Sequence, residues 1–157
     1  MKVAVGDPAP PFTLEDQHSD VWSLEAQRGR PVVLYFYPKD DTPGCTTQAR
    51  AVRDRWEDFA DLDAAVAGIS PDDTASHQRF ASKHDLPHRL LADPDREVLE
   101  AFGAWGEKQR GGETVMGVIR SSVVIDPDGK VAAVFDTIQP DEQADRSLEV
   151  VRGLLEG

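Results

Sequence analysis

The 157-residue sequence has one cysteine, no asparagine and no long apolar run. A single cysteine excludes an internal disulfide and a cysteine-rich zinc site, and the lack of asparagine excludes N-linked glycosylation. No stretch approaches the roughly 18 apolar residues of a membrane-spanning helix, and the first residues lack the apolar core of a signal peptide. These absences predict a cytoplasmic protein without a membrane segment.

Positive charge is also scarce, because the chain has only five lysines, a net charge of −12 and a pI near 4.6. This balance argues against binding to nucleic acid or to anionic membranes, since phosphate groups would be repelled. Two interpretations of the acidity remain open. It suits a high-salt cytoplasm, where ions screen the self-repulsion, and it suits an ordinary acidic soluble protein.

The length predicts one domain over residues 1–157. Short apolar runs predict strands at 12–14, 21–24, 32–36, 64–70, 90–92, 121–125 and 131–135. Helical spacing and capping residues predict helices at 46–59, 72–84, 94–102 and 141–155. The polar, glycine-rich segment 108–117 is interpreted as a loop. This order predicts an α/β fold with a mixed central β-sheet and helices on both faces.

The single cysteine, Cys45, lies between the apolar strand 32–36 and the helix expected from Thr46. At this place the unpaired N–H groups and the positive dipole end of a helix favour the thiolate, which is the nucleophilic form. Thr42 lies three residues earlier, so its hydroxyl can turn toward the sulfur. An arginine from elsewhere would complete the site. The alternative is a buried, inert cysteine that acts as a small apolar residue.

Other residue types give weaker indications. The four histidines lack a ligand pattern and are interpreted as surface residues, so no metal site is expected. Arg50, Arg53 and Arg55 follow Cys45 and are interpreted as a solvated helix face, with a docking surface for an acidic reductant as the alternative.

The pattern Pro38-x-x-x-Thr42-x-x-Cys45 matches the active-site signature of the peroxiredoxins. The surrounding residues resemble the bacterioferritin-comigratory-protein, or Q-type, branch of that family. Further matching segments follow in the same order along the chain, at 6–14, 102–108 and 120–130. The resemblance implies a thioredoxin-like fold and a thiol-dependent peroxidase that reduces hydrogen peroxide and organic hydroperoxides without a cofactor, in antioxidant defence.

The resemblance also implies roles for four residues. Cys45 would attack the peroxide and become a sulfenic acid, and Thr42 would hydrogen bond to the sulfur and the peroxide. Arg120 would hold the thiolate charge and donate to the peroxide oxygens, while Pro38 would cover the site and limit the access of water.

One position departs from the family pattern, because Arg50 stands where many close relatives carry a second cysteine. The resemblance therefore implies a one-cysteine cycle in which an external thiol reduces the sulfenic acid. Thioredoxin, glutaredoxin or a low-molecular-weight thiol are the candidates, and the expected state is a monomer or a homodimer. The alternatives are a peroxide sensor or holdase that uses Cys45 as a redox switch, and an inactive binding module.

Overall fold

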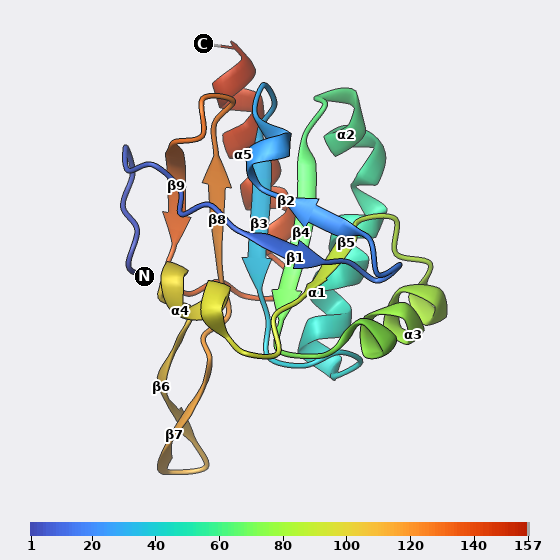
Figure 1. The fold of residues 1–157 in the computed structure, drawn as a ribbon, viewed down its shortest axis with the longest axis vertical. Helices are drawn as coiled ribbons and strands as arrows, with labels where there is room; N and C mark the ends of the chain where they lie inside the picture. The colour runs from blue at the N-terminus through green and yellow to red at the C-terminus, as the bar shows by residue number, and fades with distance from the viewer. Residues whose placement is uncertain (157) are drawn as a thin grey trace.

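A computed structural model describes residues 1–156 of the chain, in which seven strands form one mixed sheet in the order β2-β1-β5-β4-β3-β8-β9 (Figure 1). The sheet strands are β1 Thr13–Glu15, β2 Val21–Ser23, β3 Val32–Phe36, β4 Ala65–Ser70, β5 Arg89–Ala92, β8 Ser121–Ile125 and β9 Val131–Phe135. The helices are η1 Glu25–Gln27, α1 Pro43–Asp54, α2 Trp56–Asp61, α3 Thr74–His84, α4 Glu97–Phe102 and α5 Gln143–Glu156. A separate two-stranded sheet pairs β6 Trp105–Arg110 with β7 Glu113–Val118.

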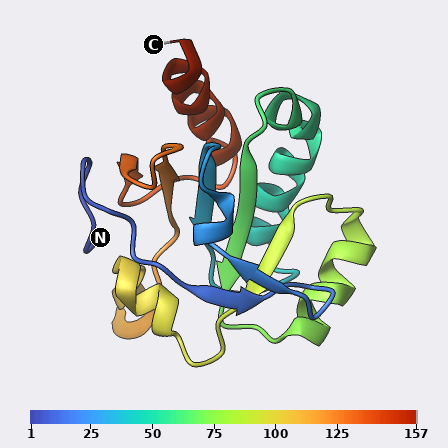
Figure 2. The same cartoon turned by 45° about the horizontal axis from the view of Figure 1, so that its top comes forward.

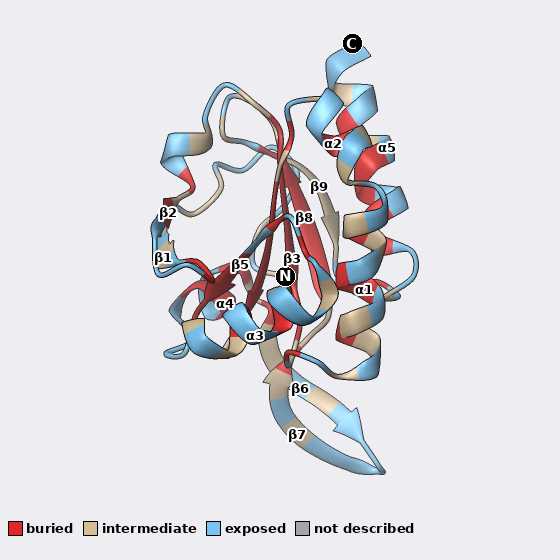
Figure 3. Cartoon of the chain, turned by 90° about the vertical axis from the view of Figure 1, so that its right-hand side faces the viewer, coloured by how far each residue is buried: buried red, intermediate tan, exposed pale blue. Residues whose placement is uncertain are grey.

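Strand β3 is the centre of the sheet, because it pairs in parallel with β4 and antiparallel with β8. All five of its residues are buried, and alternate side chains enter two separate cores. One core contains Val33 and Tyr35 and is covered by α1, α2, α3 and α5. The other contains Leu34 and Phe36 and is covered by α4 and the N-terminal segment, so the predicted mixed sheet with helices on both faces is confirmed (Figure 3).

Most predicted elements occur with shifts of one to three residues at their ends, but the helix that follows β3 differs in a way that concerns Cys45. It begins at Pro43 rather than at Thr46, and it breaks at Arg55 into α1 and α2. Proline suits the first position of a helix, because the N–H group that it lacks would have no partner there. Cys45 therefore lies inside the first turn and not before it.

The prediction of a loop over 108–117 is wrong. The segment is a hairpin in which Gly111 and Gly112 form the two-residue turn with φ values of 61° and 86°. Positive φ at both turn residues is the geometry that matches the twist of paired strands. The polar strands of the hairpin lack the alternation that predicts a half-buried strand, because both of their faces are largely solvated.

The prediction that all histidines lie at the surface is also wrong, since His77 and His88 are completely buried. Each has at least one hydrogen-bond partner inside the protein, which offsets part of the loss of water. None of the described helices is long and apolar enough to cross a membrane.

The topology brings Cys45 and Arg120 to one end of the sheet. Phe36, the last residue of β3, pairs with Ser121, the first residue of β8. Arg120 precedes β8, and the loop after β3 leads into α1, so both residues lie at the carboxyl end of β3. Figure 2 shows the sheet from another side, with the red C-terminal helix α5 packed along one face.

Candidate active site

Cys45 occupies the first turn of α1, and its side chain is only 1% exposed. Thr42 is the N-cap residue with an extended backbone, and its carbonyl accepts the first helical hydrogen bond from the N–H of Thr46 at 2.8 Å. The N–H groups that precede Thr46 have no partner within the helix, so a negative charge on the sulfur is favoured there.

Arg120 lies directly against the sulfur. Its Nη2 donates to Cys45 Sγ at 3.4 Å, and its Nη1 donates to Gln48 Oε1 at 2.6 Å. Gly44 permits this approach, because a Cβ at that position would lie 3.0 Å from Arg120 Nη2 and 3.5 Å from Pro140 Cγ. The guanidinium thus places a fixed positive charge and directed donors beside the thiol.

Gln48 is a residue of the site that the sequence interpretation missed. It follows Cys45 by three positions on α1, so both side chains share one helix face, and it is fully buried. Its Oε1 orients Arg120, while its Nε2 has no hydrogen-bond partner in the described part of the chain. The three-residue spacing from the cysteine was the signal that could have identified it.

Thr42 and Pro38 lie in the same loop as the cysteine but make no direct bond to it. The Thr42 hydroxyl donates to the Lys39 carbonyl at 2.8 Å, and within residues 1–156 no hydrogen bond joins it to Cys45. Its oxygen lone pairs therefore remain available as acceptors. Pro38 is half-buried at the start of the loop.

The loop between β3 and α1 is held by the buried carboxylate of Asp40. This group accepts hydrogen bonds from the Tyr37 hydroxyl at 2.6 Å and from the Ser76 hydroxyl at 2.7 Å, and it lies 2.7 Å from His77 Nδ1. The Asp40 N–H donates to Asp72 Oδ2 at 2.8 Å. His77 Nε2 donates to a carbonyl of β5 at 3.0 Å, so the network ties the loop to α3 and to the sheet.

Asp40, Asp72 and His77 are also close enough to be considered as metal ligands, since one atom of each lies within 4.8 Å of the others. The hydrogen bonds described above already account for their proximity. The 2.7 Å separation of His77 Nδ1 and Asp40 Oδ2 is a hydrogen-bond distance. The cluster is therefore explained as an anchor for the loop.

Two buried tyrosines adjoin the cysteine in the same core. Burial raises the pKa of Tyr35 well above its ordinary value, and the charges of Cys45 and Asp40 act in the same direction. The pKa of Tyr37 is raised first by burial and then by Asp40. The Tyr35 hydroxyl lies 2.7 Å from His88 Nε2, and burial lowers the pKa of that histidine to about 3. Both phenols and the imidazole are therefore neutral at physiological pH.

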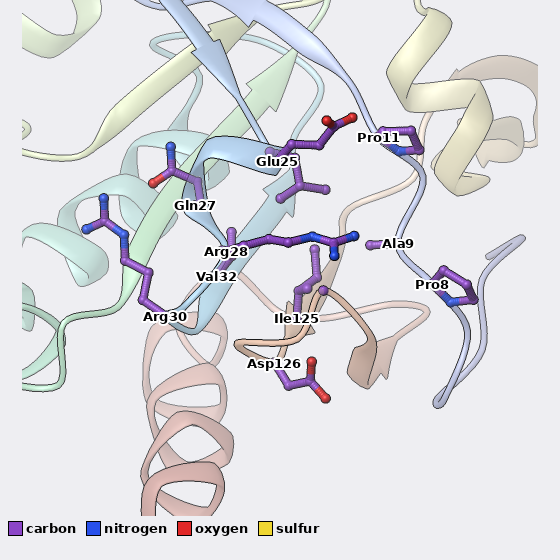
Figure 4. Close-up of a pocket in the computed structure, with 12 residues that line it drawn as sticks. Pro8, Ala9, Pro11, Glu25, Gln27, Arg28, Arg30, Val32, Ile125 and Asp126 are labelled. Carbon is purple, nitrogen blue, oxygen red and sulfur yellow. The ribbon is translucent and has the colours of Figure 1, made fainter.

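A pocket of about 360 Å³ lies at the opposite end of the sheet (Figure 4). Its lining includes Val32, at the start of β3, and Ile125, at the end of β8, and Arg28 extends across it. None of the four predicted site residues lines this pocket, so it is separate from the candidate site at Cys45.

Comparison with known proteins gives consistent matches. Residues 5–134 match the AhpC/TSA family. The chain is 38% identical over 156 residues to peroxiredoxin Bcp of Bacillus subtilis, covering 99% of each protein. It is 44% identical over 140 residues to peroxiredoxin Bcp of Escherichia coli, covering 89% of this chain and 90% of that protein.

Solved structures agree with the sequence matches. The bacterioferritin comigratory protein of Xanthomonas campestris superposes with a TM-score of 0.88 at 28% identity, covering 97% of both chains. The thioredoxin-like fold expected from the resemblance is therefore confirmed. The chain belongs to the AhpC/TSA family and, within it, to the Bcp or Q-type peroxiredoxins, which are thiol-dependent peroxidases.

Proposed function

We propose that Cys45 is the thiolate that reacts with peroxide and that it works in a one-cysteine cycle. The observation that carries this proposal is the contact of 3.4 Å between Arg120 Nη2 and Cys45 Sγ in the first turn of α1. A positive guanidinium and the unpaired N–H groups of a helix start act together on one sulfur, which favours its nucleophilic form.

In the first step the sulfur attacks the near oxygen of the peroxide. An S–O bond forms and the O–O bond breaks. The proton of the attacked hydroxyl passes to the leaving oxygen, which departs as water or an alcohol, and Cys45 becomes a sulfenic acid after protonation. Arg120 donates to the oxygen on which negative charge develops, and such preorganised donors contribute several kcal/mol in other enzymes.

Thr42 and Pro38 have supporting roles in this proposal. Because the Thr42 hydroxyl donates to the Lys39 carbonyl, its lone pairs can accept the O–H of the incoming peroxide and orient it. Pro38 limits the access of water at the start of the loop. The relative from Xanthomonas campestris is described by its alkyl peroxide reduction, which supports organic hydroperoxides as substrates beside hydrogen peroxide.

The sulfenic acid is then reduced by an external thiol, since the sequence contains no other cysteine and Arg50 stands at the position of the second one. Without a reductant, further peroxide would oxidise the sulfur to a sulfinic acid. The proposal also includes a cytoplasmic location, one domain over residues 1–157, and a monomer or homodimer that binds neither nucleic acid nor membranes.

The test is peroxide consumption by the reduced protein with dithiothreitol as the reductant. Cys45→Ser should abolish turnover while leaving the circular dichroism spectrum unchanged, and the matched substitution Thr47→Ser, at an exposed position on the same helix, should have no effect. Residual turnover in Cys45→Ser would refute the assignment. A single oxidation without repeated turnover would instead indicate a peroxide sensor.

A further inference from the structure

A second cation lies at the base of the β6–β7 hairpin, which projects from the end of the sheet where β3 ends (Figure 1). Lys108 is half-buried, whereas its neighbours Glu107 and Gln109 are exposed. Its Nζ donates to the Val118 carbonyl at 3.0 Å, two residues before Arg120. The side chain is thus directed toward the base of the hairpin, where the active site lies, and not toward the tip.

Gly117 provides the path for this side chain. A Cβ on Gly117 would lie 3.2 Å from Lys108 Cδ and 3.4 Å from its Cε, so the aliphatic stem of the lysine runs directly over the glycine. The stem loses much of its freedom in this arrangement, and the ammonium stays in one place. The Lys108 side chain therefore packs along the hairpin and extends toward the Val118 carbonyl, two residues before Arg120.

The charges around Lys108 include those of the active site. Its pKa is lowered first by desolvation and then by the positive charges of Arg120 and Arg110, while the Cys45 thiolate acts in the opposite direction. Within the described residues, neither Lys108 nor Arg120 forms a salt bridge with a carboxylate.

An unsatisfied donor adds to the positive character of the site. Gln48 is fully buried, and its Nε2 has no partner among the described residues although its Oε1 is bonded to Arg120. A buried amide N–H without a partner costs free energy, which a bound acceptor would recover. Arg120 beside the sulfur, the amide bonded to it and Lys108 at the base of the hairpin thus give this end of the sheet a positive character that favours an anion.

We propose that Lys108 and Arg120 select a carboxylate-bearing, low-molecular-weight thiol as the reductant of the Cys45 sulfenic acid. This inference rests on the proposed function of Cys45. A small thiol fits the observed burial, because Cys45 is only 1% exposed and the β6–β7 hairpin projects from the same end of the sheet (Figure 1). The carboxylate pairs with the lysine while the thiol sulfur reaches Cys45.

The two reductive steps balance without another reactant. The sulfur of the first thiolate attacks the Cys45 sulfur, an S–S bond forms and the S–O bond breaks, and the hydroxyl leaves as water after it takes up a proton. A second thiolate then attacks the sulfur of the bound small molecule, which releases the Cys45 thiolate and a small-molecule disulfide. Two thiols supply the two electrons that reduce the sulfenic acid.

The experiment is a two-stage rapid-mixing measurement that follows tryptophan fluorescence. The reduced protein is first oxidised with one equivalent of hydrogen peroxide, and the sulfenic acid is confirmed with a trapping reagent and intact mass. It is then mixed with one of three thiols of similar size: anionic mercaptoacetate, neutral 2-mercaptoethanol or cationic cysteamine. Each rate constant is expressed per thiolate, because the three thiols differ in pKa.

The wild-type protein should react at least about tenfold faster with mercaptoacetate than with cysteamine, and Lys108→Gln should lower this ratio by roughly three- to tenfold. The rate with neutral 2-mercaptoethanol is the internal reference. The matched control is Lys130→Gln, which removes the same charge from an exposed lysine at the other end of the sheet and should leave the ratio unchanged. About 1 M salt should bring the ratio close to one, since screening is then strong.

The two stages separate the two proposals. A wild-type ratio near one, or a ratio that Lys108→Gln and Lys130→Gln change equally, would overturn the selection of an anionic thiol while Cys45 stays the peroxide-reacting residue. A first stage that yields no sulfenic acid would count against the role of Cys45, and the inference that rests on it would fail with it.

Discussion

His88 makes the stability of this protein depend on pH. The imidazole is completely buried, its Nε2 lies 2.7 Å from the Tyr35 hydroxyl, and its Nδ1 has no partner within residues 1–156. Burial lowers its pKa from the ordinary value of 6.5 to about 3. The folded protein therefore holds His88 neutral over a range of pH in which the unfolded chain binds a proton.

The sign and size of the effect follow from proton linkage. Between the folded pKa of about 3 and the unfolded value of 6.5, the unfolded state binds more protons, so the free energy of unfolding falls as the pH falls. The stabilisation is complete above the unfolded value and is lost progressively below it. Since pH 5 lies well above the folded pKa, the loss at that pH is set by the unfolded histidine and amounts to about 2 kcal/mol.

Urea unfolding followed by tryptophan fluorescence, between about pH 7.5 and pH 5, measures this loss for the wild type and for His88→Gln. Glutamine retains a polar atom for Tyr35 but does not titrate, so the variant should lack about 2 kcal/mol of the pH dependence, whatever its stability at neutral pH. Exposed His18 provides the matched control, and His18→Gln should retain the wild-type slope. Equal slopes in the wild type and His88→Gln would refute the reasoning.

Three further predictions concern the groups around Cys45. Gln48→Leu should slow peroxide reduction by roughly ten- to one hundredfold in rapid-mixing assays, because Arg120 loses the acceptor at 2.6 Å. Gln48→Glu keeps an acceptor but adds a negative charge beside the thiolate, so it should also be slower than the wild type; a wild-type rate in Gln48→Leu would contradict this role. Asp40→Asn should lower the free energy of unfolding in urea by about 2–4 kcal/mol, since an amide cannot accept from all the donors that surround the carboxylate; an unchanged value would remove the network as an anchor. Gly68→Ala should cost about 1–3 kcal/mol in the same assay, because the new Cβ would lie 2.6 Å from Tyr35 Cζ; a neutral effect would show that the tyrosine ring can move.

The sequence predicts the sheet well where burial imposes a clear pattern. Strands β3, β4 and β8 are continuous apolar runs, because both faces of a central strand are covered. The β6–β7 hairpin escaped prediction since its residues are mostly solvated, so its pairing depends on the turn at Gly111 and Gly112 and not on a buried face. The burial of His77 and His88 could not be predicted from the sequence, because their hydrogen-bond partners, Asp40 and Tyr35, are far away along the chain.

The residues of the candidate site also differ in whether the sequence alone could identify them. Cys45 is evident from the sequence because its local setting at a strand-to-helix junction is unusual, and Arg120 was reached only through the family resemblance. The structure brings those two residues together. The positions of Gln48 and Lys108 depend on the direction of each side chain, which the spacing of residues along the chain does not specify.

The absence of a second cysteine changes what helix α1 must do during the reaction. Residues 45 and 50 both lie within this helix, and Cys45 is buried whereas Arg50 is exposed. Five residues in an α-helix place two Cα atoms about 9 Å apart on different faces, whereas a disulfide requires a separation of at most about 7 Å. A disulfide between these positions would therefore require α1 to unwind. With Arg50 in place no such bond forms, so α1 and the loop held by Asp40 can stay folded throughout the cycle. In the proposed cycle the reductant must then reach Cys45 within the folded site, where the positive charges of Lys108 and Arg120 favour an anionic thiol.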